Sequence, residues 1–150
     1  MKILLDTNIL VYAFDPADLT RQQQAFHILE YLHLGGNGCL SAQCLSEFFS
    51  AATRPKRGNP PRLTPTEAIR VVSQLAAQFE TYPLTATIIM EAGRGVCDHR
   101  LAYYDAQIWA TARLNQTPVI FSEDFQHGQS LEGVRFINPF QSDFNLDAWA

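Results

Sequence analysis

The chain has no run of apolar residues close to the roughly 18 that are needed to cross a membrane. It also reaches Asp6 too early for the apolar core of a signal peptide. Its three cysteines lack the paired spacing of a zinc site or a disulfide framework. We therefore expect a cytoplasmic protein with reduced thiols and no membrane association.

Charged residues are scarce, at 17% of the chain against an average of about 25%. The net charge of −4 is unusual for a protein that binds nucleic acid, because such proteins normally present a basic surface. The basic residues are unevenly distributed, however, and four of them fall in a segment without acids: Arg54, Lys56, Arg57 and Arg62. Net charge alone therefore does not exclude a polyanionic substrate.

No internal repeat, low-complexity tract or linker divides the 150 residues. The hydrophobic fraction of 47% is ordinary for a globular domain, and the length is sufficient for a sizeable core. We expect a single domain that spans residues 1–150.

Short apolar segments alternate with helical patterns along the chain. Residues 2–5 are typical of a buried parallel strand, and Asp6-Thr7-Asn8 then provides a helix cap. Further strands are expected at 38–40, 81–84, 118–121 and 135–137. Helices are expected at 20–34, after Ser41, at 64–79, at 85–96 and at 105–114. This alternation predicts a three-layer α/β/α sandwich with a mostly parallel central sheet.

Four acidic residues are predicted at the carboxyl-terminal edge of that sheet, where α/β proteins place their sites. They are Asp6 after the first strand, Glu47 and Asp105 in the first two turns of their helices, and Asp124 after strand 118–121. Glu47 shares the apolar face of its helix, where an unpaired acid is costly. Each acid alone has an ordinary interpretation as a cap or turn residue, but four at one edge indicate a site.

Carboxylates gathered at one place repel one another and raise each other's pKa values. A compensating cation is therefore expected. Oxygen ligands without histidine or cysteine favour Mg²⁺ or Mn²⁺. Such ions position and deprotonate a water molecule and stabilise the charge that develops at a phosphodiester.

The segments around these acids resemble those of PIN-domain nucleases. Leu4-Leu5-Asp6-Thr7-Asn8-Ile9-Leu10 is similar to their opening motif. Residues 103–112 are similar to the helix that carries their third acid, and residues 119–125 to their last strand and fourth acid. Residues 133–140 resemble the closing segment of VapC-type members. The similarity covers essentially the whole chain.

The resemblance implies a PIN fold and Mg²⁺- or Mn²⁺-dependent cleavage of single-stranded RNA regions. It also implies a type II toxin–antitoxin system, with a cognate antitoxin and homodimer formation. Mapped by motif, the acidic positions are Asp6, Glu47, Asp105 and Asp124, the last in preference to Glu123. Thr7, Asn8 and Ser122 fall at polar positions that orient ligands or water in the family.

Other interpretations remain open at this point. The basic residues Arg54, Lys56, Arg57 and Arg62 could contact RNA phosphates, form a solvated loop, or bind the antitoxin. The chain could also be a non-catalytic PIN-fold module that binds RNA or protein. A phosphatase on a similar α/β architecture is disfavoured, because Asn8 stands where haloacid dehalogenase-type enzymes need a second aspartate.

Overall fold

The computed structural model describes residues 1–149. The strands are β1 (Ile3–Leu5), β2 (Gly38–Ser41), β3 (Glu80–Tyr82), β4 (Val119–Phe121), β5 (Ser130–Leu131) and β6 (Val134–Ile137). The helices are α1 (Thr7–Ala13), α2 (Leu19–Gly35), α3 (Ala42–Thr53), α4 (Pro65–Gln78), α5 (Ala86–His99) and α6 (Tyr103–Leu114). A 3₁₀ turn, Leu146–Trp149, closes the described chain.

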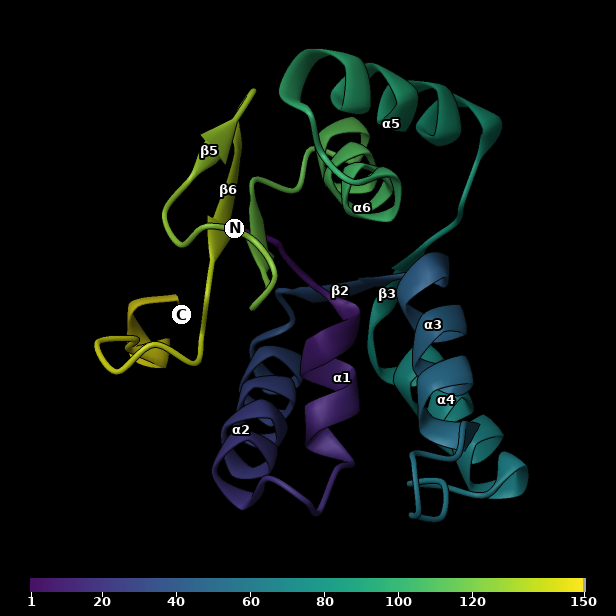
Figure 1. Ribbon diagram of the computed structural model, residues 1–150. Coiled ribbons are helices and arrows are strands. Elements are labelled where there is room, and N and C mark those ends of the chain that lie inside the picture. Colours follow the sequence, from purple (N-terminus) through teal and green to yellow (C-terminus); the bar gives the residue numbers. More distant parts are fainter. Residues whose placement is uncertain (150) are drawn as a thin grey trace.

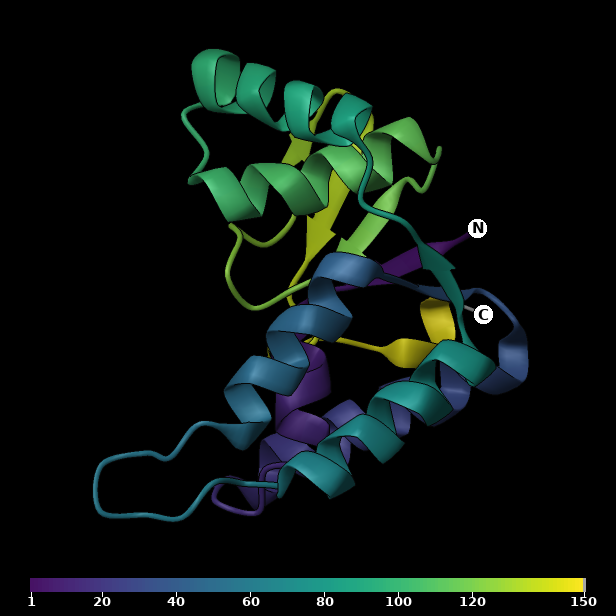
Figure 2. The same cartoon turned by 90° about the vertical axis from the view of Figure 1, so that its right-hand side faces the viewer.

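The strands form one sheet in the order β3-β2-β1-β4-β6-β5. Neighbouring strands are parallel except for β5 and β6, which are antiparallel. Helices α5 and α6 cover one face of the sheet, and α1 to α4 lie on the other (Figures 1 and 2). The predicted three-layer, mostly parallel architecture is confirmed. Strand β5 was not predicted, because two residues are too few to carry a strand periodicity.

The central strands are apolar along their whole length. Ile3, Leu4 and Leu5 of β1 are all completely buried. Central parallel strands have this continuous pattern because helices cover both of their faces. The C-terminal tail adds to this cover, since Phe144 and Trp149 both pack edge-on against Phe121 of β4.

Side-chain caps fix the beginnings of five helices, among them α2, where Asp18 accepts a hydrogen bond from the Arg21 N–H. Asp6 caps α1, Ser41 caps α3 and Thr85 caps α5, each by accepting a hydrogen bond from a backbone N–H. Thr64 and Glu67 form a capping box at α4. These starts agree with the sequence predictions, because each cap residue satisfies backbone donors that a helix leaves free. Among the helices described over residues 1–149, none is long and apolar enough to span a bilayer.

Helix α6 begins earlier than predicted. Its first residue is Tyr103 rather than Asp105, and its N-cap, Ala102, makes no side-chain hydrogen bond. The prediction relied on the acid as the start signal, and a cap without a polar side chain leaves no such signal in the sequence. Asp105 nevertheless remains in the first turn of α6, at the same edge of the sheet as the end of β1.

Candidate active site at the acidic edge of the sheet

Asp6 is the most deeply buried of the predicted acids, with 4% of its surface exposed. Its Oδ1 accepts a hydrogen bond from the Thr7 N–H at 2.7 Å, and its Oδ2 accepts one from the Ser122 hydroxyl at 2.6 Å. Strands β1 and β4 pair in parallel with Leu5 opposite Phe121. Asp6 follows β1 and Ser122 follows β4, so the pairing of the two strands brings their side chains together.

Ser122 connects Asp6 to the turn that carries Asp124. Its Oγ accepts hydrogen bonds from the Asp124 N–H at 3.0 Å and from Asn8 Nδ2 at 3.3 Å. Asn8 Oδ1 in turn accepts a long bond from the Glu123 N–H. Two of the polar residues expected to support the site, Asn8 and Ser122, therefore contact each other and the acidic segment.

Glu47 lies beside the start of α1. Its Oε2 accepts a hydrogen bond from the Thr7 hydroxyl at 3.1 Å. Its Oε1 accepts one from Gln43 Nε2 at 2.6 Å. Thr7 thus bonds to Asp6 through its backbone and to Glu47 through its side chain, which places these two acids next to each other.

The acids also influence one another electrostatically. Burial raises the pKa of Asp6 to about 7, although hydrogen bonds from Ser122 and Thr7 oppose the shift. The negative charges of Asp124 and Glu47 raise it further. Burial likewise raises the pKa of Asp105, and the same two charges contribute. Asp6 and Asp105 therefore lie in surroundings that disfavour their ionisation, and the charges of Glu47 and Asp124 contribute to this at both positions.

The donor chemistry of this edge suits a hard, hydrated cation. Within residues 1–149, no group of three or more His, Cys, Asp or Glu side chains is arranged to hold a metal ion on its own. Mg²⁺ does not require such a cage, because it retains several waters and is often bound by one or two carboxylates. The four acids offer carboxylate oxygens as ligands, and the charges of Glu47 and Asp124 add to the effect of burial in raising the pKa values of Asp6 and Asp105. The residues present fit Mg²⁺ or Mn²⁺.

Glu123 lies next to Asp124 but is engaged elsewhere. Its carboxylate accepts hydrogen bonds from the Tyr12 hydroxyl at 2.5 Å and from Arg21 Nε at 2.9 Å. Glu123 therefore links the turn after β4 to α1 and α2. This supports the choice of Asp124 as the fourth acid of the site.

The sequence analysis missed Gln43, which bonds directly to Glu47. Gln43 is one helical turn before Glu47 on α3 and is only 7% exposed. Residues four apart lie on the same helix face. An amide at this spacing from an acid on the apolar face was the signal that could have identified it.

The predicted basic residues separate into two kinds. Arg54, Lys56 and Arg57 are exposed in and beside the loop between α3 and α4, which extends well away from the sheet (Figure 2). Arg62 is instead paired with Asp15, with 2.8 Å between Nε and Oδ2 and side-chain exposures of 13% and 9%. Its charge is already compensated within the protein.

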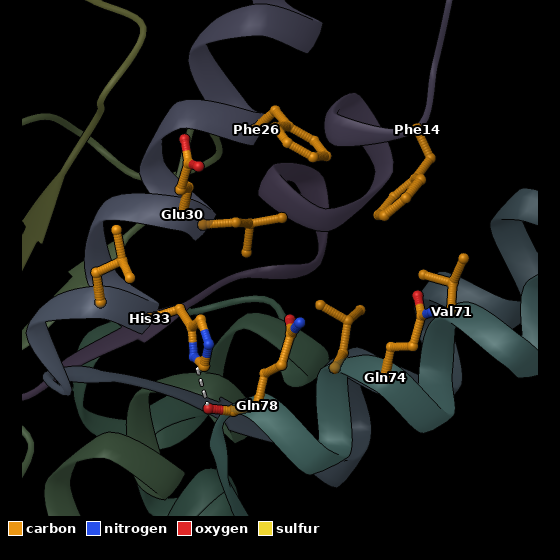
Figure 3. Close-up of a pocket in the computed structure, with 10 residues that line it drawn as sticks. Phe14, Phe26, Glu30, His33, Val71, Gln74 and Gln78 are labelled. Carbon is orange, nitrogen blue, oxygen red and sulfur yellow. Dashed lines mark hydrogen bonds between the residues drawn. The ribbon is translucent and has the colours of Figure 1, made fainter.

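A hollow of about 330 Å³ lies between α2 and α4, away from the acidic edge. Figure 3 shows Phe14, Phe26 and Val71 around it, with the His33 ring bonded to the carbonyl oxygen of Gln78. Its lining includes none of the four acids. The hollow is lined by one acid, Glu30, rather than by a group of acids, so the acidic edge is the candidate active site.

A known family model covers the segment of the chain that contains the four acids. The family model described as the PIN domain matches residues 3–129. The chain belongs to the PIN domain family. The matched segment contains Asp6, Glu47, Asp105 and Asp124, so the whole acidic edge lies within the PIN domain. The resemblance noted from the sequence motifs is confirmed.

Solved structures share this PIN fold. A toxin–antitoxin complex from Klebsiella pneumoniae aligns with a TM-score of 0.68 and 19% identity, over 93% of this chain and 99% of the other. DNA-bound VapBC from Salmonella typhimurium aligns with a TM-score of 0.64 and 19% identity, over 91% of this chain and 96% of the other. VapC20 of Mycobacterium tuberculosis, described as a sarcin-ricin loop cleaving toxin, aligns with a TM-score of 0.65 and 20% identity, over 89% of this chain and 99% of the other. At such identities the similarity establishes the fold. No curated protein sequence matches the chain.

Proposed function

We propose that this PIN domain, as one unit over residues 1–150, is a metal-dependent endoribonuclease that hydrolyses phosphodiester bonds in single-stranded RNA. The observation that carries the proposal is the shared environment of four carboxylates, in which Asp6 has a pKa raised to about 7. Such a concentration of negative charge is unfavourable without a cation. The likeness to VapC20, which is described as a sarcin-ricin loop cleaving toxin, supports RNA as the substrate.

In this proposal Asp6, Glu47, Asp105 and Asp124 hold Mg²⁺ or Mn²⁺. The bound cation would supply a water of lowered pKa and stabilise the negative charge on the phosphate. Ser122 orients Asp6, and Thr7 orients Glu47, through the hydrogen bonds described above. Water oxygen forms the new bond to phosphorus, the bond to the 3′-oxygen breaks, and that oxygen takes up a proton. The products carry a 5′-phosphate and a 3′-hydroxyl.

Metal removal tests this mechanism. We expect EDTA to abolish cleavage of a single-stranded RNA and added Mg²⁺ or Mn²⁺ to restore it, because the four carboxylates cannot replace the cation. Mapping of both fragment ends should give 5′-phosphates and 3′-hydroxyls. Cleavage that persists in EDTA and leaves cyclic phosphates would contradict the metal mechanism. RNA binding without cleavage would indicate a non-catalytic module. Release of phosphate from monoesters, without cleavage of RNA, would indicate a phosphatase.

We further propose that the RNA strand leaves the acidic edge along α3 towards the basic loop. Glu47 and Arg54 are seven residues apart, which is two helical turns and about 10 Å of rise. Arg54 is the C-cap of α3, so it lies at the end of the helix that leads from Glu47 into the basic loop. Arg54, Lys56 and Arg57 are exposed there and available to phosphates, whereas Arg62, also a candidate from the sequence, is bonded to Asp15.

The double variant Lys56→Gln/Arg57→Gln tests this path. Each phosphate contact to a single strand contributes about 0.7 to the slope of log K against log salt. We expect the variant to bind RNA more weakly and to lower the slope by about 1.4, as measured by fluorescence anisotropy at several salt concentrations. The matched control is Arg70→Gln, an exposed charge on α4 outside the loop. Equal effects of the two changes would remove the loop from the proposed path.

We also propose a cognate antitoxin and a second copy of the chain as partners in the cytoplasm. Two of the similar solved structures are titled as a toxin–antitoxin complex and a DNA-bound VapBC. The surface of this chain is compatible with a partner, because Ile89, Met90 and Val96 of α5 are exposed. Large apolar side chains gathered on a surface commonly mark a protein interface.

A further inference from the structure

Gln43 links two elements of the acidic edge. Its Nε2 donates hydrogen bonds to Glu47 Oε1 at 2.6 Å and to the Tyr104 carbonyl oxygen at 3.1 Å. A primary amide has two N–H donors, and both are used here. One bond reaches the Glu47 carboxylate on α3, and the other reaches the first turn of α6 at the residue before Asp105.

The contacts also determine the orientation of the amide. If its oxygen and nitrogen were exchanged, Oε1 would face a carboxylate oxygen and a carbonyl oxygen, which are both acceptors. In the orientation observed, Oε1 is buried and has no hydrogen-bond partner within residues 1–149. A buried acceptor of this kind costs about 1–3 kcal/mol. The arrangement is thus not optimal for stability alone.

Both oxygens of Glu47 are held by different elements. Thr7 at the start of α1 binds Oε2, and Gln43 binds Oε1. Loss of either donor would free the carboxylate to rotate about its side-chain torsions. Loss of Gln43 would in addition remove a hydrogen bond between α3 and the first turn of α6, next to Asp105.

We propose that Gln43 is a positioning residue that fixes the Glu47 carboxylate relative to Asp105 for binding of a divalent cation. The inference rests on the proposed metal-dependent function of this site. Residues that hold the ligands of a metal, without touching it, typically affect affinity by 10- to 100-fold.

Titration calorimetry with Mn²⁺ alone tests the inference without any measurement of RNA cleavage. Gln43→Met keeps the length of the side chain but removes both donors. We expect it to weaken Mn²⁺ binding by roughly tenfold or more. The matched control is Gln24→Met. The side-chain amide of Gln24 also donates a hydrogen bond to a backbone carbonyl, that of Pro139 at 3.2 Å, but does not contact an acid. This control should lower the melting temperature without changing Mn²⁺ affinity.

A double-mutant cycle with Glu47→Gln shows whether Gln43 acts through Glu47. If it does, Gln43→Met should have little further effect on Mn²⁺ affinity in the Glu47→Gln background. An unchanged affinity in the single variant, or a loss of the same size in both backgrounds, would overturn the inference. If Gln43→Met does not fold, Gln43→Asn replaces it, since the shorter side chain withdraws the same donors. A wild-type protein that binds no Mn²⁺ would instead overturn the proposed function itself.

Discussion

Replacement of Asp6 by asparagine should abolish RNA cleavage and at the same time stabilise the protein at alkaline pH. Asparagine can still accept the Thr7 N–H bond that caps α1, but it has no negative charge to hold a cation. Loss of one metal ligand is expected to slow cleavage by roughly a thousandfold or more, since the metal contributes several kcal/mol to transition-state stabilisation. The stabilisation arises because a buried, crowded carboxylate is removed.

The pH dependence of stability follows from the raised pKa of Asp6. In the folded protein this pKa is about 7, against an ordinary value of 3.8. Between these two values the folded state binds a proton that the unfolded state has lost, so stability falls as the pH rises through this interval. The shift corresponds to about 4 kcal/mol when complete above pH 7. Asp6→Asn should remove this contribution and leave that of Asp105, whose pKa is also raised.

Calorimetric melting in EDTA at several pH values measures this effect, and cleavage assays with Mn²⁺ measure the loss of activity. Asp143→Asn serves as a control, because Asp143 is an exposed acid of the C-terminal tail. It should leave both properties unchanged. An Asp6→Asn protein that melts below the wild type at alkaline pH would refute the account of the carboxylate environment, and one that cleaves RNA would refute the assignment of Asp6.

The second large effect is expected at Arg62. Arg62→Met should lower the free energy of unfolding by about 3 kcal/mol, because removal of one partner from a buried ion pair leaves the other charge uncompensated. Burial alone would raise the pKa of Asp15, but hydrogen bonds from Arg62 and from the Ala17 N–H lower it overall. The pair therefore stabilises the wild type above the unfolded pKa of Asp15, and this contribution is lost as the pH falls through the folded pKa.

Urea unfolding at neutral pH provides the measurement. Arg57→Met is the control, since Arg57 is exposed in the same loop, and it should cost little stability. The double variant Asp15→Asn/Arg62→Met should recover part of the loss, because no unpaired charge remains. If Arg62→Met were as stable as the control, the pair would not have the structural role assigned to it.

The acidic edge could be predicted from the sequence because its main determinants are local. The sequence contains a short apolar strand followed by Asp6 and another followed by Ser122 and Asp124. Parallel pairing of the two strands brings their ends together. The position of Glu47 follows from helix geometry.

Contacts between distant segments were not predictable in this way. The bond of Gln43 to Tyr104 spans 61 positions and depends on how α3 packs near α6. The bond of Arg62 to Asp15 spans 47 positions. For this reason the sequence analysis placed Arg62 with the neighbouring cations, although its side chain is only 13% exposed and is already paired with Asp15.

The place of β4 in the sheet has a consequence for the nascent chain. β4 lies between β1 and β6, so the N-terminal strand gains this neighbour only after more than four-fifths of the chain has been synthesised. Until then Asp6 lacks the Ser122 hydroxyl, and Asp124 has not yet left the ribosome. A growing chain therefore cannot assemble its acidic edge early, and the proposed nuclease activity is expected only after most of the chain has been translated.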